Sequence, residues 1–290
     1  MTTLDKPMLL QRRWAMPRIR LGGGNATLIA ALVVLGLLVL TALFAPWIAP
    51  HDPNAVDLSA TLSGSSSAHP LGTDQSGRDV LSRLIVGART GLLGPLVVVV
   101  FSTVLGMLIG VIAAWNGGVV DAVLSRAMDM VFSFPGLLLA ILLVAIFGAG
   151  GTAPVIAMSV AYVPYVGRLT RGVALQEKAR PYIQAYQVQG WSGWMISLRH
   201  LIPNIAALVL AQAAINFGYA LMDLAALSYL GFGVQPPTPD WGAMINEGSA
   251  ALQRGALLPA LAPGVLIVIA VVAFSTVGEG FADHLAKRER

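Results

Sequence analysis

The sequence predicts an all-α, polytopic membrane protein that crosses the bilayer about six times. Of its 290 residues, 56% are hydrophobic and 11% are charged. A chain with so few charged side chains cannot cover the surface of a water-soluble globule of this size. In addition, several uninterrupted apolar runs approach the roughly 20 residues that an α-helix needs to cross the hydrocarbon core of a bilayer.

Six apolar runs are candidates for membrane-spanning helices. The first follows five basic residues and could be read as a cleaved signal peptide, but it is long and no small-residue cleavage site follows it. Before the first span (26–48) we expect an N-terminal segment (1–25). After it we expect a segment outside the membrane with a short interfacial helix (49–90), a permease core with five spans (91–282) and a tail (283–290). The predicted spans cover residues 26–48, 92–114, 123–147, 154–173, 206–230 and 257–281.

The distribution of lysine and arginine predicts which side of the membrane each loop faces. Cytoplasmic loops carry an excess of these residues. With an even number of spans both termini lie on one side, and fourteen of the eighteen lysine and arginine residues then fall on that side. The sequence therefore predicts a protein of the cytoplasmic (inner) membrane, with both termini in the cytoplasm, the 49–90 segment outside and the 174–203 segment inside.

Several kinds of site are not expected. The net charge is +4, but the basic residues flank spans and do not form an aromatic-interleaved face, so nucleic acid is not an expected partner. Cysteine is absent, which excludes thiolate ligands, and the four histidines lie far apart in the sequence, so no metal site is expected. The sequence has no Gly-x-x-x-x-Gly-Lys-Ser/Thr loop, so the chain is not expected to cradle a nucleotide's phosphates in that way.

The 49–90 segment is expected to form proline-rich turns followed by a short helix. Prolines at positions 46, 50 and 53 end the first span. Further along, Ser76 and Asp79 have the spacing of a capping box. The apolar residues between Val80 and Ile85 fall on one helical face. This pattern predicts a short amphipathic helix at the outer membrane interface.

Two glycines, Gly190 and Gly193, divide the 174–203 segment. A helix before Gly190 and a second element after it would make a helix-turn-helix that projects from the membrane. The glycines would allow the positive φ or the close contact that the corner needs, and Pro203 would begin the fifth span. From the residues alone, an ordinary amphipathic connector is an equally good interpretation.

Polar side chains inside the spans are informative because a carboxylate near the bilayer centre costs about 3 kcal/mol. Asn216 and Asp223 lie on about the same face of the fifth predicted span, which makes them candidates for lining a substrate path. The alternative is that Asp223 lies near the outer end of its span and pairs with an arginine, and its position favours this alternative. Two Gly-x-x-x-Gly pairs, at 87–91 and 106–110, predict close packing between helices.

Fixed residues in the 174–203 segment follow a known spacing. Ala185, Gly190 and Pro203 keep their intervals, and the segment ends in His-Leu-Ile-Pro-Asn. This pattern resembles the cytoplasmic loop of binding-protein-dependent ABC importer permeases, which reads Glu-Ala-Ala, three residues, Gly, nine residues, Ile-x-Leu-Pro. Gln184 and Tyr186 depart from it, at the acidic position and at the second alanine. The ending looks like that of the peptide and nickel branch.

Two further stretches carry the same resemblance. Residues 69–83 read His-Pro-Leu-Gly-Thr-Asp-Gln-Ser-Gly-Arg-Asp-Val-Leu-Ser-Arg, and residues 227–242 read Leu-Ser-Tyr-Leu-Gly-Phe-Gly-Val-Gln-Pro-Pro-Thr-Pro-Asp-Trp-Gly. Both look like segments of the peptide and nickel branch, and residues 126–135 resemble its third span. The resemblance covers nearly the whole chain from residue 26 onward.

The resemblance implies a type I-like ABC importer permease fold and a non-catalytic permease subunit that moves short peptides. It implies a homologous second permease subunit, two ATP-binding cassette subunits that use ATP and Mg²⁺, and an extracytoplasmic substrate-binding protein as partners. No cofactor is expected on this chain itself. The residues implied in ATPase coupling are Gln184, Ala185, Tyr186, Gly190, Trp191, Ser192, Gly193, His200 and Pro203. Those implied to face the binding protein are Asp74, Arg78, Asp79, Pro236, Pro237 and Trp241.

Other functions remain as alternatives. Within the same family, nickel or another small solute could be the cargo. An ion-coupled secondary transporter would be expected to show inverted repeats and broken helices around an intramembrane ion site, and the sequence has no convincing repeat. An intramembrane enzyme would need a nucleophile, a base or metal ligands inside the spans, and no recognisable constellation of these occurs.

Overall fold

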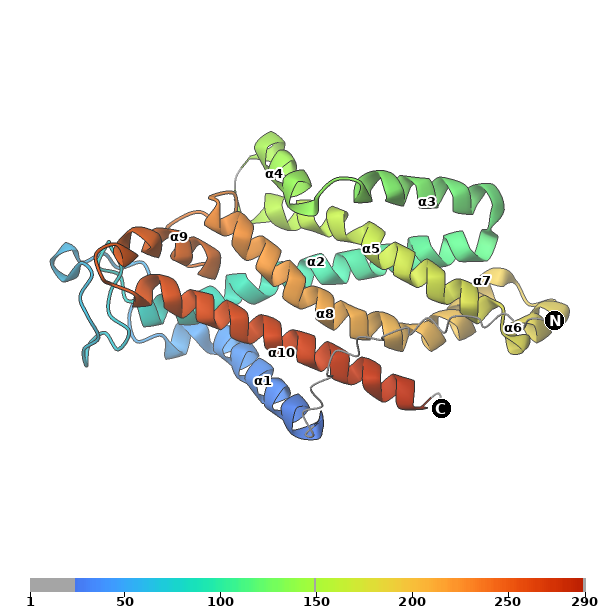
Figure 1. Cartoon of the computed structure of the whole chain (residues 1–290), viewed down its shortest axis with the longest axis horizontal. Coiled ribbons are helices and arrows are strands. Elements are labelled where there is room, and N and C mark those ends of the chain that lie inside the picture. Colours follow the sequence, from blue (N-terminus) through green and yellow to red (C-terminus); the bar gives the residue numbers. More distant parts are fainter. Residues whose placement is uncertain (1–23, 149, 289–290) are drawn as a thin grey trace, which may run out of the picture.

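The computed structural model describes residues 24–148 and 150–288 (Figure 1). Most of the predicted N-terminal segment and the last two residues of the tail therefore lie outside the described residues. Within them the ordered elements are helical, apart from an isolated bridge between Thr73 and Asp79. The elements are α1 (Gly24–Ile48), η1 (Leu58–Ala60), α2 (Val80–Asn116), α3 (Gly118–Phe132), α4 (Gly136–Phe147), α5 (Thr152–Lys178), α6 (Pro181–Val188), α7 (Gly193–Ile196), η2 (Ser197–Leu201), α8 (Ile202–Tyr229), α9 (Trp241–Leu252) and α10 (Leu258–Arg288).

The helices form one elongated bundle. Helices α2, α5, α8 and α10 run along its length, α1 packs on α10 and α2, and α3 packs on α2 and α5 (Figure 1). The 49–79 segment and α9 lie at one end of the bundle, called here the α9 end. Helices α6 and α7 lie at the other, the α6 end. The two hydrophilic segments are thus at opposite ends, as the sequence predicts.

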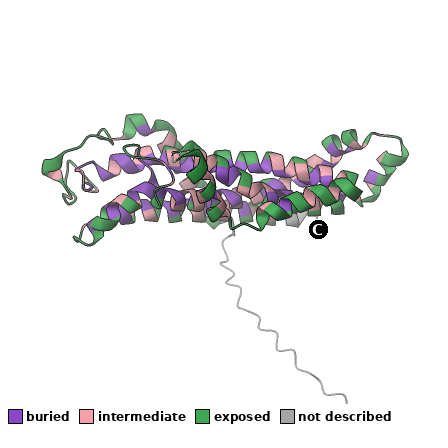
Figure 2. Ribbon diagram, turned by 90° about the horizontal axis from the view of Figure 1, so that it is seen from above, coloured by how far each residue is buried: buried purple, intermediate pink, exposed green. Residues whose placement is uncertain are grey.

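The outer surface of the bundle is apolar over most of its length. Large apolar side chains such as Leu37, Leu43 and Val268 are exposed, and buried residues lie where the helices face one another (Figure 2). Among the described residues, four segments are long and apolar enough to cross a membrane, in α1, α2, α7–α8 and α10, and the bent pair α3 and α4 would be a fifth. The predicted span 154–173 lies inside the more polar α5. Five of the six predicted segments lie almost entirely within single helices.

The third predicted span is not one helix, which corrects the expectation for residues 123–147. Helices α3 and α4 meet at an angle of 82° across the break between them. Pro135 favours this break, because it lacks an amide hydrogen and its ring disfavours the helical conformation of the preceding residue. Residues between Phe132 and Gly136 therefore leave the bundle axis.

The predicted interfacial helix is also wrong as a separate element. Residues 80–85 form the first turns of α2, which continues for 37 residues to Asn116. Gly87 and Gly91 lie within this continuous helix, and both face the ring of Trp241. Asp79, and not Ser76, is the N-cap, since its Oδ2 accepts a 2.8 Å hydrogen bond from the amide of Ser82.

The contact between α2 and α5 is the most extensive in the bundle. A Cβ added at Gly106 would lie 2.7 Å from the Cβ of Val166, and one at Gly110 would lie 2.6 Å from the carbonyl oxygen of Gly167. The two backbones can therefore approach only because these positions lack side chains. This confirms the close packing predicted from the second Gly-x-x-x-Gly pair.

Replacing Gly110 by leucine should destabilise the bundle by about 2 kcal/mol, because the new side chain overpacks the α2–α5 contact. Gly36→Leu in α1 is the matched control, since nothing lies within 4 Å of a Cβ there. Thermal unfolding of the chain in detergent measures both. Equal unfolding midpoints for the two variants would contradict the role given to Gly110.

Candidate functional site

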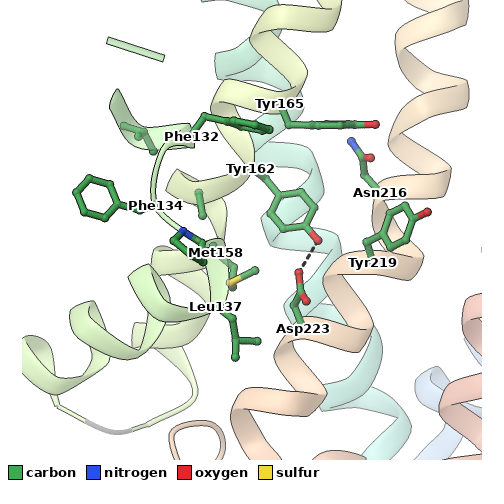
Figure 3. A pocket seen from close by; sticks show the side chains of 13 residues that line it. Phe132, Phe134, Leu137, Met158, Tyr162, Tyr165, Asn216, Tyr219 and Asp223 are labelled. Atoms are coloured by element: carbon green, nitrogen blue, oxygen red, sulfur yellow. Dashed lines mark hydrogen bonds between the residues drawn. The ribbon is translucent and has the colours of Figure 1, made fainter. Parts of the chain in front are cut away.

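A cavity of about 600 Å³ lies between α5, α8 and the break that separates α3 from α4 (Figure 3). We call it the central cavity. Its lining is mainly apolar and aromatic, and Asp223 is the one aspartate, glutamate, lysine, arginine or histidine among the described residues that line it. The aromatic residues in the lining are Phe132, Phe134, Tyr162, Tyr165 and Tyr219.

Helical spacing brings the polar lining residues together. On α8, intervals of three and then four residues separate Asn216, Tyr219 and Asp223, and this spacing places them on one helix face. On α5, Tyr162 and Tyr165 repeat this spacing. The break at Pro135 supplies the third wall. The prediction that Asn216 and Asp223 share a face is therefore confirmed, whereas their part in a substrate path stays a prediction.

Within the described part of the chain, Asp223 pairs with a tyrosine and not with an arginine, which corrects the alternative that its position favoured. The Tyr162 hydroxyl donates a 2.7 Å hydrogen bond to Asp223 Oδ2 (Figure 3). The two residues come from neighbouring helices, α5 and α8. Their hydrogen bond therefore ties the two main walls of the central cavity together.

Asn216 is buried, with 1% of its surface exposed. Its Oδ1 accepts a 3.2 Å hydrogen bond from Gln212 Nε2, one turn earlier on α8. Its Nδ2 has no hydrogen-bond partner within the described residues. A buried amide donor without a partner is uncommon because its desolvation is not compensated, so this group is available to a ligand.

At the α6 end, residues 181–201 form the predicted helix-turn-helix, which we call the hairpin. Helix α6 precedes Gly190, and α7 and the π-helical turn η2 follow it. Gly190 has a φ of +79°, a conformation that suits glycine. Gly193 lies so close to the ring of Trp115 that a Cβ would overlap its Nε1 atom. Both roles expected of these glycines are therefore confirmed. Pro203 lies in the first turn of α8, which continues the helix from η2.

Of the two residues at which the hairpin departs from the family pattern, Tyr186 has a defined side-chain contact. The ring of Tyr186, at the position of the second alanine, stacks on His200 with a centroid distance of 4.2 Å. Trp191 completes the cluster at 5.1 Å from Tyr186. The cluster joins the two arms of the hairpin. Ser192 caps α7 by accepting a hydrogen bond from the amide of Met195.

Glu177, a residue that sequence reasoning missed, anchors the hairpin to the bundle. It is buried at the end of α5, and its Oε1 accepts a 2.5 Å hydrogen bond from Tyr182 of α6 and a 3.1 Å hydrogen bond from Asn204 of α8. Arg180 Nε lies 2.8 Å from its other oxygen. Burial and the hydrogen bond to Glu177 raise the pKa of Tyr182 to about 12. The sequence signal was an acidic residue just before the Arg-Pro start of α6.

The outer face of the hairpin is exposed and partly apolar. Gln184 and Ala185 are exposed there, as expected of residues that contact a partner. Sequence reasoning did not select Val188, which is 89% exposed, or Trp194, which is 59% exposed. Exposed apolar side chains at an end of the bundle are typical of a docking surface.

At the α9 end, four of the residues expected to face a binding protein are buried, which corrects that expectation. Asp74, Arg78, Asp79 and Trp241 have between 1% and 9% of their surface exposed. The indole of Trp241 donates a 3.0 Å hydrogen bond to the carbonyl of Leu84. These side chains hold the end of the bundle together. Of the expected contact residues, Pro236 and Pro237 are exposed.

At the α9 end, two arginines share the carboxylate of one glutamate. Arg78 Nη2 and Arg83 Nη2 donate hydrogen bonds of 2.6 and 3.0 Å to Glu247 Oε2 in α9. Arg78 Nε also donates a 2.7 Å hydrogen bond to Asp74. The Arg83 side chain is 1% exposed. A buried guanidinium needs such partners, so Glu247 fixes α9 against the start of α2.

Two histidines that are distant in the sequence meet beside Asp79. His69 Nδ1 lies 3.0 Å and His51 Nδ1 lies 3.8 Å from the Asp79 carboxylate. One potential metal-ligand atom from each of the three residues lies within 4.8 Å of the other two. His51 and His69, which are far apart in the sequence, therefore meet in space, and the absence of a metal site stays a prediction. Burial opposes ionisation of Asp79, but hydrogen bonds from Ser82 and His69 outweigh it and lower its pKa.

Comparison with known proteins identifies similar chains. Residues 106–290 match the family described as "Binding-protein-dependent transport system inner membrane component", and residues 25–68 match the "N-terminal TM domain of oligopeptide transport permease C". A di/tripeptide transport system permease protein of Pseudomonas aeruginosa is 39% identical over 90% of this chain and 88% of its own.

Two further relatives and one solved structure agree with this. A probable D,D-dipeptide transport system permease protein of Escherichia coli is 36% identical over 90% of this chain and 88% of its own. A glutathione transport system permease protein of Pectobacterium atrosepticum is 36% identical over 88% and 85%. A chain of the inward-facing MetNI methionine ABC transporter has the same fold, with a TM-score of 0.56 and 19% identity over 70% of this chain and 95% of its own. The predicted fold class is confirmed.

Glu247→Ala should lower the stability of the chain by about 3 kcal/mol, because it leaves the buried guanidinium of Arg83 without its closest carboxylate. Glu279→Ala, which removes an exposed carboxylate from α10, is the matched control and should change stability by less than about 0.5 kcal/mol. Thermal unfolding in detergent compares the two. A Glu247 variant as stable as the Glu279 variant would show that Asp74 alone satisfies the arginines.

Proposed function

The chain belongs to the family of binding-protein-dependent transport system inner membrane components, and from that membership we propose that it is a permease subunit of an ATP-driven importer of short peptides. The names of its relatives support this cargo, since they are permeases for di- and tripeptides, D,D-dipeptides and glutathione. The size of the central cavity, about 600 Å³, also suits a small peptide, since small-molecule sites measure roughly 300–1,000 Å³.

One structural observation carries the proposal: the two helices that line the central cavity also bear the hairpin. Helix α5 ends at Lys178, three residues before α6 begins, and α8 continues directly from η2. Glu177 and Asn204 join these helices where they enter the hairpin. A force on the hairpin would therefore reach both walls of the central cavity through rigid helices.

The energy for transport comes, in this proposal, from partner subunits. The chain has no phosphate-binding loop of the Gly-x-x-x-x-Gly-Lys-Ser/Thr type, so two ATP-binding cassette subunits would use ATP and Mg²⁺ and dock on the exposed face of the hairpin. Val188 and Trp194 would be apolar contacts there. Closure of the ATPases would shift the bundle between inward-open and outward-open states.

Two further partners would bind at exposed parts of the bundle. A homologous second permease subunit would close the central cavity on its open side. An extracytoplasmic substrate-binding protein would dock at the α9 end, where Pro236 and Pro237 are exposed. The excess of lysine and arginine at the opposite end and in the terminal segments supports placing the hairpin and both termini in the cytoplasm.

ATP-dependent peptide uptake tests the proposal. The chain is purified gently with the subunits that accompany it and reconstituted in liposomes with its binding protein. Labelled trialanine should accumulate when ATP is supplied to the cytoplasmic side, and an uncoupler should not prevent this. Uptake that needs no nucleotide but is abolished by the uncoupler would indicate an ion-coupled transporter instead.

Gly190→Pro should leave the spans inserted but abolish most substrate-stimulated ATP hydrolysis, because proline cannot adopt the φ of +79° at the hairpin corner. Gly117→Pro is the matched control, because this glycine has a φ of +65°, a Cβ added to it would also meet no atom within 4 Å, and it lies outside both the hairpin and the α9 end. The assay measures ATPase activity with and without loaded binding protein. Normal stimulation in the Gly190 variant would refute the coupling role of the hairpin.

A further inference from the structure

The Asp223 carboxylate has no cationic partner, although it lies in an apolar part of the bundle. Among the described residues no lysine, arginine or histidine forms an ion pair with it, and its hydrogen-bond donor is the hydroxyl of Tyr162. A carboxylate has two oxygens and about four acceptor sites. Asp223 therefore keeps most of its acceptor capacity for a group that enters the central cavity.

Aromatic residues line the same cavity as this carboxylate. Tyr162 and Tyr165 approach from α5, and Tyr219 lies on the same face of α8 as Asp223 (Figure 3). Phe132 and Phe134 line the wall at the helix break. Ring faces attract cations, and sets of aromatic side chains bind ammonium groups in this way. A carboxylate beside several aromatic rings is thus a chemical environment for an organic cation.

Asn216 is a second, independent indication that the central cavity binds a ligand. Its Nδ2 group is buried and has no partner among the described residues, yet the residue lines the central cavity two turns before Asp223 on α8. An amide donor in this position can bind a carbonyl oxygen. The central cavity therefore offers an acceptor for a cation and, along the same helix face, a donor for a carbonyl.

A free peptide N-terminus carries these two groups together, an ammonium with three donors and, from the same residue onward, the carbonyl oxygens of the peptide backbone. We propose that the central cavity binds the α-ammonium group of the transported peptide between Asp223 and the tyrosine rings, with Asn216 donating to a peptide carbonyl. This inference rests on the proposed function and specifies which end of the cargo the chain recognises.

The composition of the lining distinguishes this ligand from others. A calcium ion takes six to eight oxygen ligands, and the described lining contains one carboxylate. No lysine, arginine or histidine occurs in that lining to hold the C-terminal carboxylate of a peptide. The central cavity is thus expected to recognise the N-terminus and to tolerate variation at the other end and in the side chains.

Saturation-transfer difference NMR tests the inference on the full chain in lipid nanodiscs, with the subunits that co-purify and without the binding protein. Trialanine should bind about tenfold more tightly than N-acetyl-trialanine, which lacks the ammonium charge. Asp223→Asn should weaken trialanine binding about tenfold and leave N-acetyl-trialanine unchanged. Asp129→Asn, the same substitution at an exposed residue outside the central cavity, should change neither.

Further variants separate recognition from folding. Asp223→Glu keeps the charge and should retain the preference for trialanine. Tyr219→Phe keeps the aromatic face and should bind as the unmodified chain does, whereas Tyr219→Leu should bind trialanine about threefold more weakly. If Asp223→Asn fails to fold, this tyrosine pair decides: a Tyr219→Leu variant that binds as tightly as Tyr219→Phe overturns the inference.

Binding of a simple organic cation distinguishes failure of the ammonium site from failure of the proposed function. Binding of n-butylammonium should depend on Asp223 in the same way as binding of trialanine. If liposomes take up no peptide while n-butylammonium binding still depends on Asp223, the proposed cargo is wrong and the ammonium site stands. If peptide uptake is normal while Asp223→Asn leaves trialanine binding unchanged, the ammonium site is wrong and the proposed function stands.

Discussion

The close contact between α2 and α5 is the constraint on which the rest of the structure depends. In a bilayer, helices gain little hydrophobic free energy by associating, so they are held by close van der Waals packing and by hydrogen bonds. Gly106 and Gly110 permit that packing along α2. On the other side of α5, Arg171 donates two hydrogen bonds, of 2.5 and 2.6 Å, to Asp121 of α3. Helix α5 is therefore fixed on two sides, which positions one wall of the central cavity.

The same helix links the central cavity to the hairpin. Tyr162 in the middle of α5 donates to Asp223 of α8, and Glu177 at its end accepts from Asn204 of α8. The two hydrogen bonds lie about four turns apart along α5. Both therefore hold α5 and α8 in register, one beside the ligand space and one at the hairpin. The hairpin and the central cavity therefore share the same two helices.

The sequence-based predictions were least accurate at segments whose structure depends on contacts with distant residues. Residues 123–147 are apolar enough for one span, yet Pro135 breaks the helix, and the break forms a wall of the central cavity. The Ser76–Asp79 spacing suggested a capping box, but the bridge between Thr73 and Asp79 and the hydrogen bond to Ser82 make Asp79 the cap. Charged residues near α2 looked like surface groups because nothing in their own segment reveals Glu247, which lies more than 160 residues away.

The sequence by itself determined the membrane location, the approximate number of helices, the hairpin with its two glycines and the shared face of Asn216 and Asp223. These properties follow from composition and from the helical repeat, which act over a few turns. The tertiary structure decided the partner of Asp223, the meeting of His51 with His69, the burial of Arg83 and the anchoring role of Glu177. Each of these depends on which helices pack together, and that packing is set by side-chain shape across segments that are far apart in the chain.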